Sequence, residues 1–419
     1  MRQFRIASVL ACLGLILPAC SSAPTRSPPA HYDLLIRNGA VYDGSGAAAQ
    51  SVDVAVNGDR VVALLPAGTP ASATTVIDAG GHAVAPGFIN VLSWATESLI
   101  ADGRGMSDTM QGVTLEIFGE GWSGGPLTEA MRAQALKQQS DFHFPIPWTS
   151  LGEYLEHLQQ LGITPNIASF VGATTVRIHE LGEDDVAPTP EQLSRMQDLV
   201  RAAMREGALG VGASLIYPPA FFAKTDELVA LAQAAAESGG GYVAHMRSEA
   251  DQFLPALEET ITIARATGQH AEAYHLKAAG ARNWPKMAKA VARIDQARSE
   301  GVDIAANMYA YTAGATGLTA ALPPWVQAGG HDVMIKRLKD PAIRQRVIAE
   351  MKGPAKGWEN LRELAGDDAK VLFIGFRSEA LKPLTGKTLA DVIVIRRPSP
   401  STLIPYPTIE RAAAVSTEY

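Results

Sequence analysis

Cysteine is almost absent from this chain of 419 residues, which contains only Cys12 and Cys20. Both lie within the first twenty residues, so the body of the chain has no disulfide, no thiolate metal ligand and no cysteine nucleophile. A basic cluster is lacking too: the formal net charge is −7, and no group of Lys and Arg stands out. Because nucleic-acid-binding proteins carry such clusters, this composition argues against a nucleic-acid partner.

The first twenty residues resemble an export signal rather than a folded element. Two arginines precede an apolar run over residues 6–17 that is too short to span a bilayer comfortably. Residues 17–20, Leu-Pro-Ala-Cys, resemble a bacterial lipobox. We therefore expect an exported bacterial protein with one of two forms. In the first, a lipid on Cys20 anchors the chain to a membrane through a disordered tether over residues 21–31. In the second, an ordinary secretory signal delivers it to the periplasm.

Beyond the tether, the hydrophobic pattern divides the chain into two parts. Residues 32–84 are β-rich and contain an Asn-Gly pair at 57–58 that predicts a hairpin. From residue 85, apolar runs alternate with helical segments, which is typical of a parallel sheet, and the length suits a barrel plus a smaller domain. Seven strand-like runs are found, at residues 83–92, 113–118, 167–171, 208–215, 242–245, 271–276 and 304–309.

Two histidines, His245 and His275, lie at or near the ends of neighbouring strand-like runs, 30 positions apart. This separation is one β/α unit, so in a parallel barrel both would lie at the carboxyl rim, where active sites form. Imidazole is a common zinc ligand, and the matching positions favour a metal-facing pair. The alternative is two core histidines with satisfied hydrogen bonds.

A series of motifs follows a fixed order along residues 32–390. They are 32–39 (YDLLIRNG), 41–46 (VYDGSG), 85–94 (APGFINVLSW), 207–219 (GALGVGASLIYPP), 224–228 (KTDEL), 242–249 (YVAHMRSE), 274–280 (YHLKAAG) and 309–314 (YAYTAG). As a set they resemble the N-acyl-D-amino-acid deacylase (D-aminoacylase) family of the amidohydrolase superfamily. The resemblance implies an α/β fold with an incomplete TIM-type (β/α) barrel over 85–390 and a small β-sandwich domain over 32–84. It also implies a zinc-dependent hydrolase of non-peptide C–N bonds, acting on an N-acyl amino acid or a related amide.

The resemblance also implies a metal site. His245 and His275 match the histidine ligands that the family draws from its fifth and sixth strands. Gly121 stands at the place of a cysteine ligand, and Glu120 beside it could supply a carboxylate instead. Two histidines, one carboxylate and an open fourth position suit one catalytic zinc ion. The alternative for Glu120 is a solvated or ion-paired side chain that faces the other way.

Four residues are expected to bind substrate. Tyr217, Lys277 and Tyr309 align with residues that line the family's pocket, and Lys277 suits a substrate carboxylate, as does Arg247. For each, the alternative is a salt-bridged rim residue or a tyrosine packed in the barrel mouth. Glu120 and Lys277 are the predicted catalytic residues.

The chain departs from the family pattern at both ends of the barrel. The first strand of the family usually ends Asp-x-His-x-His, but Leu92 and Trp94 occupy the histidine positions, and neither can ligate a metal. No Asp follows Asp391, so the family's general base, worth about 10²- to 10⁴-fold in rate, has no counterpart. Residues 391–419 form an atypical tail, which could include an improvised eighth strand over 391–396. A weak hydrolase, a non-catalytic ligand-binding lipoprotein and a truncated, inactive product are therefore all open.

Overall fold

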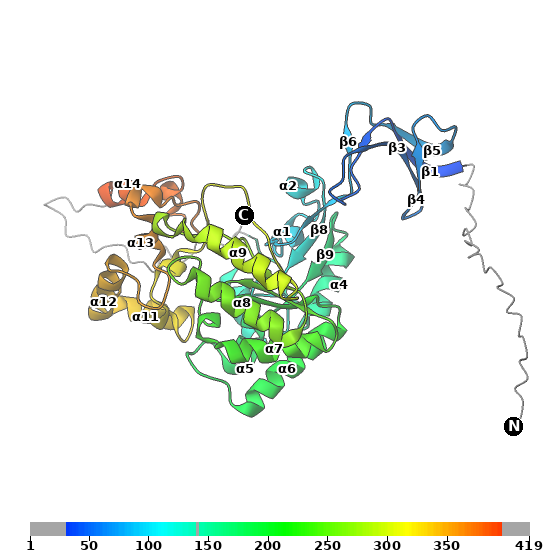
Figure 1. The fold of residues 1–419 in the computed structure, drawn as a ribbon. Coiled ribbons are helices and arrows are strands. Elements are labelled where there is room, and N and C mark those ends of the chain that lie inside the picture. The colour runs from blue at the N-terminus through cyan, green and yellow to red at the C-terminus, as the bar shows by residue number, and fades with distance from the viewer. Residues whose placement is uncertain (1–30, 140–141, 396–419) are drawn as a thin grey trace, which may run out of the picture. The chain divides into compact units, whose positions relative to one another are not determined.

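The computed structural model describes residues 31–139 and 142–395 of the chain. They form two compact units that divide after Pro86 (Figure 1). Among these residues, no helix has both the length and the apolar character needed to cross a membrane. The predicted export signal with Cys20, and the tail beyond residue 395, lie outside the described residues.

The first unit is one mixed six-stranded sheet with the order β5-β1-β3-β2-β6 and with β4 paired to β3. Its strands are β1 (His31–Arg37), β2 (Ala40–Val41), β3 (Gln50–Asn57), β4 (Arg60–Pro66), β5 (Ser72–Asp78) and β6 (Ala83–Val84). The hairpin predicted from Asn57 and Gly58 is confirmed, because β3 and β4 pair antiparallel around that turn. Gly58 has a φ of 57°, a left-handed conformation that glycine adopts without strain.

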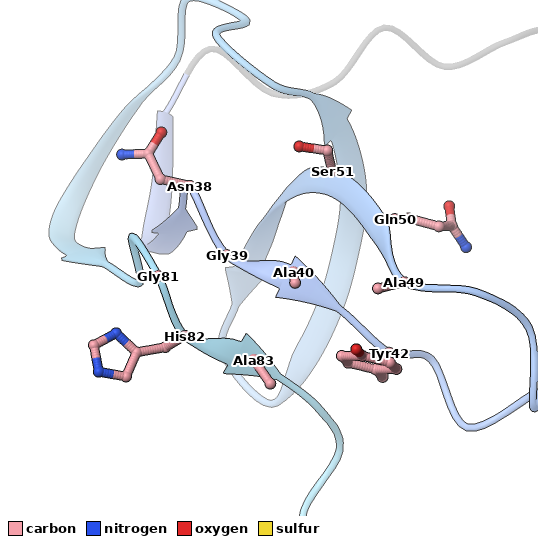
Figure 2. Close-up of a pocket in the computed structure, with 10 residues that line it drawn as sticks. All are labelled: Asn38, Gly39, Ala40, Tyr42, Ala49, Gln50, Ser51, Gly81, His82 and Ala83. Atoms are coloured by element: carbon pink, nitrogen blue, oxygen red, sulfur yellow. The ribbon is translucent and has the colours of Figure 1, made fainter.

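A hollow of about 510 Å³ lies beside β2, β3 and β6 in this unit (Figure 2). Its only imidazole is that of His82, whose Nδ1 lies 3.0 Å from the carbonyl oxygen of Gly80. No carboxylate lines the hollow, so it lacks the donor set of a metal site.

The second unit contains seven consecutive parallel strands, with the third interrupted at Phe170. They are β7 (Phe88–Asn90), β8 (Val113–Phe118), β9 (Asn166–Ser169) with β10 (Val171–Gly172), β11 (Gly210–Ser214), β12 (Gly241–His245), β13 (Ala271–Ala273) and β14 (Ile304–Ala306). They pair in parallel as a three-stranded sheet, β7-β8-β9, and a five-stranded sheet, β10-β11-β12-β13-β14, which meet at Phe170. Each of the seven matches one of the predicted runs.

Helices connect these strands, as the alternating pattern predicts. They are α1 (Ser98–Ala101), α2 (Met106–Thr109), α3 (Glu129–Gln138), α4 (Leu151–Leu161), α5 (Ala173–Leu181), α6 (Pro190–Arg205), α7 (Thr225–Ala236), α8 (Phe253–Thr267) and α9 (Lys286–Ser299). Local chemistry marks their starts: Ser150 with Glu153, and Thr189 with Gln192, form capping boxes before α4 and α6. Figure 1 shows α5 to α9 around the strands, and their apolar faces join the strands in the cores of this unit.

After β14 the described chain continues as helices: α10 (Pro324–Gln327), α11 (His331–Lys339), α12 (Pro341–Lys352), α13 (Leu361–Ala365) and α14 (Leu389–Ile395). An eighth strand over 391–396 is therefore wrong. The side chain of Thr388 accepts from the backbone N–H of Asp391, and the Asp391 carboxylate accepts from the Thr388 backbone. This reciprocal cap starts a helix despite the β-branched residues that follow.

Candidate metal centre

Glu120 enters the site because two glycines let the chain turn sharply after β8. Gly119 and Gly121 have φ values of 106° and 79°. A Cβ atom on Gly119 would lie 2.3 Å from the Phe170 carbonyl oxygen, and one on Gly121 would lie 2.5 Å from the Cβ of Ser214. Any larger residue would clash, so the close approach depends on glycine at both positions.

The two histidines reach the same place from neighbouring strands. His245 is the last residue of β12, and His275 follows β13 by two residues. The φ of His275 is 37°, a conformation that is uncommon for a residue with a side chain. Its backbone N–H donates to Asn307 Oδ1 at 2.6 Å, which helps to hold this geometry. The imidazole centroids are 4.5 Å apart, so the expected proximity is confirmed.

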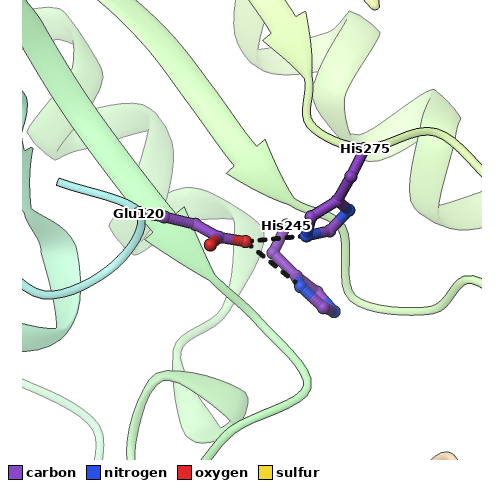
Figure 3. Close-up of side chains that lie close together, drawn as sticks. All are labelled: Glu120, His245 and His275. Atoms are coloured by element: carbon purple, nitrogen blue, oxygen red, sulfur yellow. Dashed lines mark hydrogen bonds and ion pairs between the residues drawn. The ribbon is translucent and has the colours of Figure 1, made fainter. Parts of the chain in front are cut away.

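Glu120 lies beside both imidazoles, and one of its oxygens faces the two rings (Figure 3). Its Oε1 is 2.8 Å from His275 Nε2 and 3.3 Å from His245 Nδ1. Glu120 and His245 are buried, whereas His275 is partly exposed. The structure thus brings together the three predicted ligands, and their role in binding a metal stays a prediction.

This donor set fits a divalent cation. One ligand atom from each residue lies within 4.8 Å of the others, and ligands on one tetrahedral zinc ion are roughly 3.3 Å apart. The buried Nε2 of His245 has no hydrogen-bond partner. Two imidazoles and a carboxylate that leave a position open are a typical catalytic zinc set.

Glu249, which the sequence reasoning missed, completes the cluster on the far side of His275. Its Oε1 lies 3.0 Å from His275 Nδ1 and 2.5 Å from Lys277 Nζ. Its other oxygen lies 3.9 Å from His245 Nε2. The available signal was its position four residues after His245, in the loop that follows β12. A carboxylate on the second nitrogen of a metal-binding histidine fixes the ring orientation.

The charges of the cluster stabilise one another. Burial alone would raise the pKa of Glu120, but its hydrogen bonds to His245 and His275 outweigh burial and lower the pKa to about 2. Burial opposes the charge of Glu249 as well, yet the nearby histidines and Lys277 lower the pKa of its carboxyl to about 2. Burial would lower the pKa of His275, but the two carboxylates raise it to about 9.

Another missed residue, Glu359, holds the loop that carries Glu249. Its Oε1 accepts hydrogen bonds from Ser248 Oγ at 2.6 Å, from Ala250 N at 2.7 Å and from Glu249 N. Burial raises the pKa of Glu359, the Ser248 hydrogen bond opposes this, and the charge of Glu249 raises it further. No sequence signal identifies this contact, since Glu359 is 111 positions from Ser248.

Three of the four predicted substrate-binding residues lie beside the cluster. The ring of Tyr217 meets that of His245 edge-on at 5.1 Å, and the ring of Tyr309 lies 6.3 Å from that of His275. Lys277 Nζ is 5.4 Å from the centroid of Tyr309 and is paired with Glu249.

Arg247 has different partners. Its guanidinium forms an ion pair with Glu259 at 2.9 Å and donates to the carbonyl oxygens of Phe221 and Ala223. These contacts match the alternative of a salt-bridged rim residue. The structure does not bring Arg247 into contact with Glu120, His245 or His275.

Comparison with known proteins found no matching family model. Two curated relatives come from Alcaligenes xylosoxydans xylosoxydans. D-aminoacylase is 31% identical over 296 residues, which are 70% of this chain and 60% of the relative. N-acyl-D-glutamate deacylase is 32% identical over 336 residues, which are 80% and 64%. The chain therefore spans less than two thirds of the length of either relative.

A solved structure of a deacylase also resembles this chain. N-acyl-D-glutamate deacylase from Bordetella bronchiseptica, in complex with zinc and a phosphonate inhibitor, superimposes with a TM-score of 0.61 at 31% identity. The match covers 67% of this chain and 59% of that one. The predicted fold, an incomplete TIM-type barrel with an N-terminal β domain, is confirmed, and the barrel is open between β7 and β14 within the described residues. The motifs, the fold and these relatives together show that this chain belongs to the N-acyl-D-amino-acid deacylase (D-aminoacylase) family of amidohydrolases.

Proposed function

We propose that this chain is a zinc-dependent hydrolase of non-peptide C–N bonds, with N-acyl amino acids or related amides as substrates. The observation that carries the proposal is the convergence of Glu120, His245 and His275 at the ends of three strands. The family relationship supports it, since the similar deacylase structure contains zinc.

A zinc ion held by these three residues would act as a Lewis acid on the amide carbonyl. The protein groups provide orientation. Glu249 holds His275 through Nδ1, so that Nε2 is directed towards Glu120. Lys277 Nζ contacts Glu249 Oε1, the His275 carbonyl oxygen and His275 Nδ1. A substrate carboxylate beside Tyr309 would pair with the charge of Lys277.

We expect slow turnover. A general base must be free to take a proton from the attacking water. Glu120 is assigned to the metal, and Glu249 is paired with His275 and Lys277, so neither carboxylate is free for this role. This observation favours a second candidate function, a protein that binds an acylated amino acid beside the same three residues without hydrolysing it.

The test is elemental mass spectrometry of the purified chain, together with His275→Ala and a control, His270→Ala. His270 is exposed, and its ion-pair contacts are with Asp303 and Glu272 and not with Glu120, His245 or His275, so it is a control outside the cluster. We expect about one zinc per folded chain in the parent and control, and its loss in His275→Ala. A screen of N-acyl-D- and N-acyl-L-amino acids would follow. A folded parent that takes up no zinc contradicts the hydrolase and favours the binding protein.

We also propose that the chain is exported, with Cys20 as the lipid-bearing residue. The basic start, the short apolar run and the lipobox-like residues 17–20 support this proposal. Radiolabelled palmitate should be incorporated into the parent and not into Cys20→Ser. Equal labelling of both would contradict the anchor.

A further inference from the structure

We infer that Trp94 is a positioning residue for the metal centre, and that its indole restricts Glu120 to binding a single cation through one oxygen. The inference rests on the proposed zinc site and concerns how that site is built.

The two oxygens of Glu120 have separate partners. Trp94 Nε1 donates to Oε2 at 2.8 Å, whereas Oε1 faces His275 Nε2 at 2.8 Å and His245 Nδ1 at 3.3 Å. Glu120 is only 6% exposed, so water cannot easily replace the indole. The carboxylate is therefore oriented before any cation arrives.

The chemistry of the indole determines how Glu120 can bind a cation. Its N–H is a donor only, with no lone pair for a metal, so Trp94 can hold the carboxylate but cannot become a ligand. A hydrogen bond to a carboxylate is stronger than a neutral one. The indole occupies one lone pair of Oε2 and part of the space around it. A cation that took both oxygens, or a second cation on Oε2, would have to share this oxygen with the indole. One cation bound through Oε1 alone leaves the bond undisturbed.

The backbone around Trp94 is held on both sides. The N–H of Ser93 donates to the Ile117 carbonyl oxygen at 2.8 Å, which extends the pairing of β7 with β8. Tyr154 OH donates to the Thr96 carbonyl oxygen at 2.9 Å. Trp94 and Glu120 thus lie in the loops that follow two paired strands, four residues after β7 and two residues after β8. The hydrogen bonds of Ser93 and Thr96 hold the Trp94 loop on both sides, which fixes the position of the indole.

The experiment is a zinc titration of the full chain, with Trp94→Phe and the control Trp284→Phe, by competition with a chromophoric chelator. Phenylalanine keeps an aromatic ring and removes the N–H. Trp284 is 67% exposed and lies outside the site. We expect one zinc per chain in the parent and the control, and a Kd for zinc about 10- to 100-fold higher in Trp94→Phe, the usual effect of losing such a support. Zinc should also change the tryptophan emission of the parent and the control, and not that of Trp94→Phe.

The outcomes separate the inference from the proposal beneath it. A folded parent that binds no zinc overturns both. A parent that binds zinc while Trp94→Phe binds it within twofold overturns the role of Trp94 alone. If Trp94→Phe does not fold, X-ray absorption of the zinc-loaded parent decides. One short Zn–O distance from the carboxylate supports the inference, and two comparable Zn–O distances from it, or a second zinc ion, reject it.

Discussion

Two carboxylates contact opposite sides of one histidine ring in this site. His275 has a carboxylate on each ring nitrogen, Glu120 on Nε2 and Glu249 on Nδ1. Burial would lower the pKa of His275, but the two carboxylates raise it to about 9. The charge of this imidazole therefore depends on neighbours that lie far from it in the sequence.

Removing one of these carboxylates should lower the pKa of His275 in the metal-free chain. Glu249→Gln keeps the size of the side chain and removes its charge, so we expect the imidazole to lose its proton at a lower pH than in the parent. Nuclear magnetic resonance titration of the His275 ring measures this. Glu259→Gln, which removes the partner of Arg247 instead, serves as the control and should leave the pKa unchanged. An equal pKa in parent and Glu249→Gln would contradict the pairing.

The pH dependence of stability follows from the same shifts. The lowered pKa values of Glu120 and Glu249 contribute stability above their ordinary value of 4.5, and it is lost as the pH falls towards 2. The raised pKa of His275 contributes stability that is complete below 6.5 and is lost as the pH rises through about 9. The contribution of the cluster is therefore largest between pH 4.5 and 6.5.

We expect the Tm of the chelator-treated parent to fall between pH 6.5 and 9 by more than that of His275→Ala. Differential scanning calorimetry across this range provides the measurement. Parallel pH profiles for the two proteins would show that the cluster contributes nothing.

Elements are joined by a few buried polar contacts. The loop after β12 is held by Glu359, which accepts three hydrogen bonds from residues 248–250. Glu359→Ala would leave these donors unpaired in a buried place, at a cost of about 1–3 kcal/mol for each group that finds no water. We expect faster amide exchange at Glu249 and Ala250, a lower free energy of unfolding and weaker zinc binding.

Glu363→Ala is the matched control, because Glu363 forms a partly exposed ion pair with Arg282. Its loss should cost at most about 1 kcal/mol and leave zinc binding unchanged. If Glu359→Ala behaves like this control, the loop does not depend on Glu359.

A buried ion pair joins α5 to α7. Arg177 and Glu227 are 1% and 5% exposed and lie 2.6 Å apart. Arg177→Met would leave the carboxylate buried without its partner, at a cost of about 3–5 kcal/mol. The double variant Arg177→Met/Glu227→Leu should recover most of this loss, because no charge is then left unpaired. Urea denaturation of the three proteins tests this, and a double variant no more stable than Arg177→Met would contradict it.

At the scale of the whole molecule, the parallel sheet is open within the described residues. β7 and β14 each pair with one strand only. Ile89 on β7 is 56% exposed, and an exposed apolar edge strand favours self-association. Ile89→Lys should therefore reduce association in light scattering, while the Tm stays close to that of the parent because a surface substitution rarely exceeds about 0.5 kcal/mol. Unchanged association would show that this edge is not the contact.

Local sequence patterns were sufficient to predict the parallel strands, the hairpin and part of the site. Apolar runs identified all seven parallel strands, and the Asn-Gly turn identified the hairpin, because these signals act over a few residues. The proximity of His245 and His275 followed from one β/α unit of separation, since consecutive strands are neighbours in such a sheet. Glu120 was reached through the family resemblance and its position beside the expected cysteine.

Only the tertiary structure decided which groups surround these residues. Trp94 is 26 positions from Glu120, and Glu359 is 111 from Ser248, so no periodicity links them. The sequence predicted that Arg247 and Lys277 would both suit a substrate carboxylate. In the structure, Arg247 forms an ion pair with Glu259, whereas Lys277 forms one with Glu249 beside the histidines. The sequence by itself determined the seven parallel strands, their alternation with helices and the proximity of the two histidines, because periodicity is local. It did not determine the helices after β14. The direction of each charged side chain was decided in three dimensions, because it depends on which partners packing brings within hydrogen-bonding distance.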